Sequence, residues 1–502
     1  MNFWSKNKSL IICFGFGFLM MCVFYVELHP LVIASPDDWT YISYSRQAWP
    51  MKGAWNPGKV LPETIGGLVG NLSAFLVYPI LGDYIRTFSI CYGIFFAALA
   101  AAYITAFASL VKKCFSLDHI QTLFIAFVFF ALNFQLCKVR TINNNHLLSI
   151  YGINLGINYS MPTFVCAIMA FYIIKCVAYD DYLNTIKTYD LAYALNMFRS
   201  FKSGILFLFL YLCIFSNLIT NGTLLAVLGA AFIQRICNDI KTGIRRGFKN
   251  WFWRYSAYIA AFVMDLLCGL FELTGGNADL HDDFSLSRAI SEYPSTVKTV
   301  IDNINKPTFL TIIVIIALSL AISFSAKQKG TNDAERLRKM LIITLSALLI
   351  DFIYVSIISI RVGGYIASGM VYNGILIWVV SSGVISCAYI ISKIAELRAY
   401  IPIIAFILLF VVINIPDNVG NGFGLGDRLY GDNSSAAFYY EESNSLLEQF
   451  IDADKNGVES FTLYSKGAVG DCGQWAAYRV RRTLLRHGLI HNVMEVDVQK
   501  TN

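Results

Sequence analysis

The chain has 502 residues, of which 56% are hydrophobic and only 14% are charged. Soluble globular proteins carry about 25% charged residues, so this composition excludes an ordinary soluble protein. The net charge of +6 is modest, and the basic residues lie in short loops between apolar runs. This placement indicates orientation in a membrane and not nucleic-acid binding.

Apolar runs recur along most of the chain. About 20 predominantly apolar residues are needed to cross the hydrocarbon core of a bilayer. The eleven predicted spans are 9–28, 86–110, 119–137, 161–179, 203–219, 221–237, 252–273, 308–326, 340–360, 369–391 and 399–415. We therefore predict an all-α polytopic membrane protein with about 11 transmembrane helices, and an odd number of spans puts its two ends on opposite sides.

One further apolar stretch, 65–81, is ambiguous because it has three glycines near its start and contains Asn71 and Pro79. If it lies in the outer interface without crossing, nearly every basic cluster between spans falls on one side of the membrane. The positive-inside rule favours this arrangement. It predicts a cytoplasmic N-terminus and an extracytoplasmic side that holds 29–85, 138–160, 274–307, 361–368 and the tail from residue 416.

The tail 416–502 differs in character from the membrane part, 1–415. A Gly/Asn/Asp-rich stretch is followed by two helix-like and two strand-like segments. This pattern predicts a small α/β region, or a segment packed on the outer loops. The second helix-like segment has a basic face, for which we favour a solvated surface over contact with anionic glycan or lipid headgroups: Arg479, Arg481, Arg482 and Arg486.

Two adjacent carboxylates, Asp37 and Asp38, follow the first span by about ten residues. Like charges this close raise one another's pKa, so one can act as a base near neutral pH, and the pair can also hold a divalent cation. The same two residues after a proline also suit a helix N-terminus. Capping readily explains one acid at this place but less readily explains both. Trp39, Trp49 and Trp55 suit the headgroup level, so we expect this loop at the outer leaflet.

The layout of a first span, an outward loop with an acidic pair, interfacial helices and many further spans resembles the GT-C superfamily of polyprenyl-phosphate-sugar-dependent glycosyltransferases. The string DDW…W…NPGKVLPE resembles the acidic-pair and W-x-G-R-x-L segment of bacterial members, which include phage serotype-conversion glucosyltransferases and related membrane families. The string YGINLGINYSMPTF resembles their Asn-Tyr-x-x-Pro stretch before a span. The layout covers 1–415 and the motifs cover about forty residues. Lys59 stands where an arginine is common in these families. A guanidinium that can bind a phosphate through two hydrogen bonds is thus replaced by an ammonium that acts as a point charge.

The resemblance implies an inverting glycosyltransferase of the bacterial cytoplasmic (inner) membrane. Its partners would be a polyprenyl-phosphate sugar donor, a cell-surface glycan or lipid acceptor and membrane lipids, with no nucleic acid. Asp37 would take the proton of the acceptor hydroxyl, with Asp38 as its partner or as a ligand of a possible divalent cation, the one cofactor implied.

The leaving phosphate of such a reaction needs cations on the outer face. Arg361 is the first candidate, followed by Arg140, Arg46 and Lys59, although an arginine at the end of a span more often anchors the helix in the headgroups. The other substrate-binding residues that we assign are Trp39, Trp55, Glu63, Asn145 and His146. For the last two, a plain polar turn is the simpler interpretation.

Two other functions compete with this one. A transporter or a flippase for lipid-linked saccharides keeps its polar sites near the bilayer midplane, and Asp265 and Asp351 lie within predicted spans, where ionisable groups are functional candidates by default. Hydrogen bonds between helices explain both acids equally well. A glycan polymerase would share an outer active site, but it typically carries its catalytic residues in a large late loop.

Overall fold

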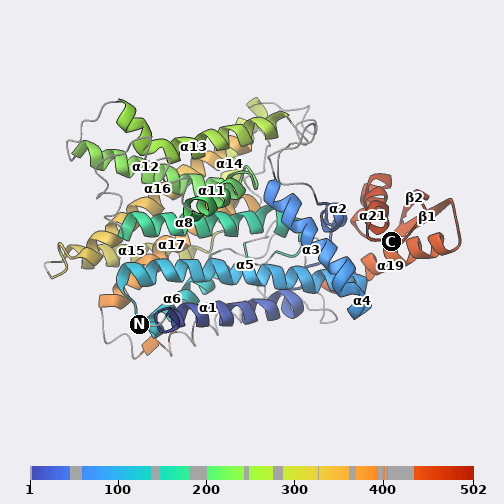
Figure 1. Cartoon of the computed structure of the whole chain (residues 1–502), viewed down its shortest axis with the longest axis horizontal. Helices are drawn as coiled ribbons and strands as arrows, with labels where there is room; N and C mark the ends of the chain where they lie inside the picture. Colours follow the sequence, from blue (N-terminus) through green and yellow to red (C-terminus); the bar gives the residue numbers. More distant parts are fainter. Residues whose placement is uncertain are drawn as a thin grey trace.

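The computed structural model describes residues 3–45, 59–136, 147–148, 150–179, 201–241, 248–274, 286–325, 327–360, 369–393, 400–401, 404, 407 and 435–501. Most of these residues are helical (Figure 1). The long helices are α1 (Phe3–Val23), α5 (Tyr84–Phe115), α6 (His119–Gln135), α8 (Met161–Tyr179), α11 (Phe201–Ile214), α12 (Gly222–Lys241), α13 (Phe248–Thr274), α14 (Leu286–Asn303), α15 (Lys306–Phe324), α16 (Asn332–Ile360) and α17 (Gly369–Lys393).

Within these described residues, eight helices are long and apolar enough to cross a membrane: Asn7–Leu28, Pro62–Leu81, Tyr84–Phe115, Ile153–Ala178, Gly222–Lys241, Lys306–Phe324, Asn332–Ile358 and Val371–Lys393. Three shorter apolar helices, in α6, α11 and α13, coincide with further predicted spans. The prediction of a polytopic helical membrane protein is confirmed. The last predicted span, 399–415, lies almost wholly outside the described residues.

The ambiguous stretch 65–81 belongs to one helix, Pro62–Leu81. It consists of π-helical turns at Pro62–Gly66 and Ser73–Val77, which alternate with α3 (Gly67–Leu72) and α4 (Tyr78–Leu81). Length and composition would allow this helix to cross a membrane. In Figure 1 it runs obliquely to α5 at one end of the bundle. The predicted interfacial position therefore stays a prediction.

The centre of the bundle is formed by α5, which packs against α1, α6 and α8. Small side chains on α5 let these neighbours approach closely, and Ala97, Ala100 and Ala101 are fully buried. Almost all of α17 is also buried, between α6, α15 and α16. Ser382 Oγ of α17 donates to Thr344 Oγ1 of α16 at 2.8 Å, which joins these two helices.

The two ends of the bundle hold different sets of charged residues. At the end that holds the N-terminus (Figure 1), Lys112 Nζ donates to Ser9 Oγ at 2.8 Å and Lys393 Nζ pairs with Asp333 at 2.6 Å. The opposite end, which we call the α2 end, holds the acidic pair in α2 (Pro36–Ser43) and the C-terminal region. These basic residues and the acidic pair thus lie at opposite ends, as the loop charges predict. Which membrane face each end occupies stays a prediction.

The C-terminal region is a small α/β module. Its elements are α19 (Ala436–Lys455), β1 (Ser460–Ser465), α20 (Ala468–Cys472), α21 (Gln474–Arg486) and β2 (Glu495–Lys500). The strands pair in parallel, from Ser460 opposite Glu495 to Ser465 opposite Lys500. Parallel pairing requires a crossover, which α20 and α21 provide. The predicted helices and strands are confirmed.

The module is also packed on the loops at the α2 end, so the second expectation for the tail holds as well. The hydroxyl of Tyr440 donates to Asp83 at the start of α5. A hydrogen bond of 2.6 Å joins His487 Nδ1 to the hydroxyl of Tyr84. Many of the module's buried apolar residues, among them Phe450, belong to the same core cluster as the bundle. Residues 435–501, the described part of the tail, are therefore a fixed part of the α2 end.

Candidate functional site

Helix α2 begins with a capping box, which explains why it starts where it does. Ser35 is the N-cap, and its Oγ accepts from the backbone N–H of Asp38 at 3.3 Å. In return, Asp38 Oδ2 accepts from the backbone N–H of Ser35 at 2.7 Å. Pro36 occupies the first helical position, where a missing N–H costs nothing. The capping interpretation of the acidic pair is therefore confirmed for Asp38.

Asp38 is buried, with 1% of its surface exposed. Its Oδ2 also accepts from the backbone N–H of Ala34 at 2.9 Å and from Ser35 Oγ at 2.8 Å, and its Oδ1 accepts from the backbone N–H of Asn154. Burial raises the pKa of Asp38 to about 6, although these donors favour the charged form. The carboxylate thus ties α2 to the segment at Asn154, and it lies outside the lining of the neighbouring cavity.

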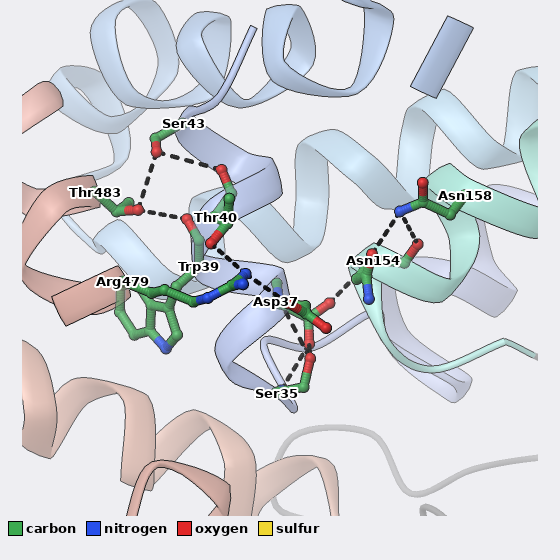
Figure 2. Close-up of polar contacts among 10 residues, drawn as sticks. Ser35, Asp37, Trp39, Thr40, Ser43, Asn154, Asn158, Arg479 and Thr483 are labelled. Atoms are coloured by element: carbon green, nitrogen blue, oxygen red, sulfur yellow. Dashed lines mark hydrogen bonds and ion pairs between the residues drawn. The ribbon is translucent and has the colours of Figure 1, made fainter. Parts of the chain in front are cut away.

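Asp37 lines a cavity of about 390 Å³ at the α2 end. Its side chain is 46% exposed, and Arg479 Nη1 of α21 pairs with its Oδ1 at 2.6 Å. The same nitrogen donates to Thr40 Oγ1 at 2.8 Å, and the guanidinium lies 3.9 Å from the ring centroid of Trp475. Figure 2 shows Arg479 reaching across to α2, with Asp37 beside Asn154. A residue 442 positions away in the sequence therefore fixes Asp37.

The cavity gathers side chains of complementary chemistry from five parts of the chain. They are the cations Lys59, Arg479 and Arg482, the carboxylates Asp37 and Glu63, the amides Asn154, Asn158 and Asn217, the phenols Tyr41, Tyr44 and Tyr159, and Thr40. Cations suit an anionic group, and amides suit hydroxyls, because amides both donate and accept hydrogen bonds. The arrangement can hold a molecule that carries both a phosphate and a sugar.

Two π-helical turns present residues to this cavity. The turn Pro62–Gly66 carries Glu63, and the turn Gly156–Ser160, which follows the short helix α7 (Ile153–Leu155), carries Asn158 and Tyr159. The backbone carbonyl of Asn158 accepts from Asn217 Nδ2 at 2.8 Å. Such turns are frequent at functional sites, because they widen the helix and redirect its side chains.

Glycines hold these elements together by direct backbone contact. A Cβ added at Gly67 would lie 1.9 Å from the carbonyl oxygen of Tyr44, and one at Gly70 would lie 1.8 Å from that of Ile42. The helix Pro62–Leu81 therefore packs on the end of α2 without room for one more atom. The glycines noted in the sequence thus serve close packing, and this contact places Glu63 at the cavity.

The structure sorts the predicted site residues into three groups. Asp37, Lys59 and Glu63 line the cavity. Asp38 and Trp39 do not line it, because both are 1% exposed and Trp39 packs in the core. The headgroup level expected for Trp39 stays a prediction. The remaining predicted residues lie outside the described part of the chain: Arg46, Trp55, Arg140, Asn145, His146 and Arg361.

No pattern in the sequence predicts the contribution of the tail to the cavity. The solvated-surface interpretation is wrong for Arg479, which pairs with Asp37, and for Arg486, whose Nη1 donates to Ser43 Oγ at 3.4 Å. Nothing in the sequence signals a contact over more than 400 residues. Asn154 is a further site residue outside the prediction, although its spacing of four residues from Asn158 in a helical stretch indicates one shared face.

The acids inside the membrane part take part in hydrogen bonds between helices. Asp265 of α13 accepts from Asn221 Nδ2 at 2.9 Å and from the hydroxyl of Tyr354 of α16 at 3.1 Å. Asp351 Oδ2 accepts from Trp378 Nε1 of α17 at 3.2 Å. These contacts fit the structural interpretation for Asp265, whereas Asp351 Oδ1 is buried without a hydrogen-bond partner among the described residues.

A divalent cation would need several ligands around Asp38. In the parts of the chain that the structure describes, no three His, Cys, Asp or Glu side chains gather to hold one. Both oxygens of Asp38 already accept hydrogen bonds, and those bonds would have to break first. The described residues therefore do not fit a metal site at Asp38.

No protein-family model, no curated protein and no solved structure matches the chain. The GT-C resemblance therefore rests on the layout and on the two sequence strings. What the fold establishes is a multi-pass helical membrane protein with a small parallel α/β module at its α2 end.

Proposed function

We propose that this chain is a membrane glycosyltransferase that moves a sugar from a polyprenyl-phosphate donor to an extracytoplasmic glycan or lipid acceptor. One observation carries the proposal. The two strings that resemble GT-C enzymes are about ninety residues apart, and both supply the lining of one cavity: Asp37, Lys59 and Glu63 from the first, and Asn154, Asn158 and Tyr159 from the second.

Asp37 has the position and chemistry of the base. The acceptor oxygen would form a bond to the anomeric carbon as the bond from that carbon to the phosphate oxygen breaks. The hydroxyl proton passes to Asp37, and the electron pair of the broken bond stays on the phosphate. One displacement with a single carboxylate inverts the anomeric centre, so the proposal is an inverting enzyme.

The cations of the cavity would stabilise the leaving phosphate, on which negative charge develops. Lys59 and Arg482 line the cavity with Asp37. Arg479 has another role, because its guanidinium is engaged by Asp37 and Thr40 and holds the base in place. We assign Arg479 as a positioning residue and Lys59 and Arg482 as the phosphate contacts.

The proposal includes a location. In a bacterial inner membrane, basic loop residues favour the cytoplasm. The end with Lys112 and Lys393 then faces the cytoplasm, and the α2 end, with the cavity and the C-terminal module, is extracytoplasmic. A polyprenyl-phosphate headgroup at the outer leaflet would lie at the level of this cavity.

The test is Asp37→Asn in membranes, assayed with a radiolabelled polyprenyl-phosphate sugar. The amide keeps the shape but cannot take the proton, so we expect transfer to fall roughly 10²- to 10⁴-fold at normal protein level. Glu448→Gln, which neutralises an exposed acid on α19, is the matched control and should transfer normally. Undiminished transfer by Asp37→Asn would exclude this site. Movement of an intact lipid-linked saccharide across the membrane, with no transfer, would favour the flippase.

A further inference from the structure

The outward face of α21 carries a stripe of three side chains, of which the proposed chemistry uses only Arg482. Trp475, Tyr478 and Arg482 are spaced by three and four residues, so they lie on one helix face. Trp475 is 51% exposed and Tyr478 is 48% exposed. The opposite face is buried in the module and consists of small and aliphatic side chains: Ala476, Ala477, Val480 and Leu484. The stripe is therefore not needed for the packing of α21.

The stripe leads directly into the cavity. Arg482, at one end of it, lines the cavity. Arg479 lies over the ring of Trp475 and pairs with Asp37, so Trp475 is one side chain away from the proposed base. Arg481 lies 5.4 Å from the ring centroid of Tyr478. Both rings are thus steadied by guanidinium groups while about half of each side chain stays exposed.

The composition of the stripe differs from that of the exposed apolar surface on a neighbouring helix. The helix Pro62–Leu81 exposes aliphatic residues and one phenylalanine: Leu68, Leu72, Phe75, Leu76, Ile80 and Leu81. The α21 stripe combines two rings that carry polar groups with an arginine. The face of a sugar ring, which presents C–H groups, packs on such rings, and its hydroxyls accept from guanidinium N–H groups.

We infer that the stripe Trp475–Tyr478–Arg482 is a binding track for the acceptor, and that this acceptor is a saccharide chain. The inference rests on the proposed function, because the track ends at the cavity that holds the proposed base. From Trp475 to Arg482 the helix rises about 10 Å, which gives room for more than one sugar ring. The track deepens the proposal by naming the acceptor class, and Trp475 and Tyr478 become specificity residues outside the reacting centre.

Binding can be measured without any transfer. The probe is the envelope polysaccharide fraction of the source cells, bound to the full-length protein in nanodiscs of neutral lipid. We expect Trp475→Ala and Tyr478→Ala each to weaken binding about tenfold, or about 1.4 kcal/mol. Trp475→Phe should restore most of it. Tyr464→Ala, which removes an equally exposed ring on β1, is the matched control and should bind as the unchanged protein does.

The outcomes separate the inference from the proposed function. Equal polysaccharide binding by all variants, or no binding by the unchanged protein, overturns the track even if Asp37→Asn abolishes transfer. If Trp475→Ala and Tyr478→Ala instead lose affinity for vesicles of anionic lipid, the stripe contacts the membrane and the saccharide assignment fails. Selective loss of polysaccharide binding in the two variants, with normal binding by Asp37→Asn, supports the track whether or not transfer is detected.

Discussion

α2 is held from two sides by contacts of opposite kind. On one side, Gly67 and Gly70 of the helix Pro62–Leu81 touch its backbone carbonyls. On the other side, side chains of α21 donate to it, as where Thr483 Oγ1 donates to the carbonyl of Trp39. A backbone contact tolerates no added atom, whereas a side-chain contact depends on charge and on hydrogen-bonding groups. The glycine side therefore sets the shape of the site, and the α21 side holds Asp37 in place through Arg479.

The glycine side should show the largest effect. Gly70→Ala puts a Cβ about 1.8 Å from the carbonyl oxygen of Ile42, so the helix must move away from α2. Overpacking against rigid backbone belongs to the severe class of substitutions, and we expect a loss of more than about 3 kcal/mol of stability. Thermal unfolding in detergent, followed by gel filtration, measures this loss.

Gly15→Ala is the control for that substitution, because no atom lies within 4 Å of the added Cβ in α1. It should leave the unfolding temperature unchanged or raise it slightly, since glycine costs a helix roughly 0.5–1 kcal/mol relative to alanine. If Gly70→Ala unfolds at the temperature of Gly15→Ala, the close contact with α2 is not present in the protein.

The contact between α2 and the segment at Asn154, made by Asp38, should show an intermediate effect on stability. Asp38→Asn leaves four donors with one acceptor oxygen and turns an N–H group toward another donor. We expect a loss of about 1–3 kcal/mol in the free energy of unfolding at neutral pH. Sugar transfer by Asp38→Asn should fall in proportion to the amount of folded protein. Asp37→Asn should instead lose sugar transfer although the protein stays folded.

Asp38 also predicts a dependence on pH. Burial raises its pKa in the folded state to about 6, above that of the unfolded chain. Its contribution to stability is therefore fully present at low pH and is lost as the pH rises through about 6. The stability of the unchanged protein minus that of Asp38→Asn should fall between about pH 4 and pH 7. A flat difference over this range would show that Asp38 is not buried as described.

The two sides of α2 differ in how far the sequence could predict them. The spans could be predicted because a bilayer requires apolar runs of a certain length. The glycines near the start of the apolar run 65–81 could also be noticed in the sequence. The ion pair of Asp37 and Arg479 joins residues 442 positions apart, and periodicity carries no information over such a distance. Aspartate serves both as a helix-capping residue and as a carboxylate in a charged site. Sequence alone therefore left open which acid of the pair serves which purpose.

The α21 side should show the smallest effect, through His487. This side chain is 6% exposed and is packed among the rings of Phe75, Tyr84 and Phe88. Burial and the neighbouring Arg486 lower its pKa to about 4. Because the folded pKa is below the unfolded value, this contribution to stability is present above about pH 6.5 and is lost as the pH falls toward 4.

At about pH 5.5 the expected loss is about 1 kcal/mol, and it should appear as looser docking of the C-terminal module. Hydrogen exchange at residues 474–487, compared between pH 7.5 and pH 5.5 after correction for the intrinsic rate, measures it. His487→Phe keeps an aromatic ring among its neighbours but cannot be charged, so its docking should not respond to pH. An equal response in both proteins would mean that other titrating groups govern this interface.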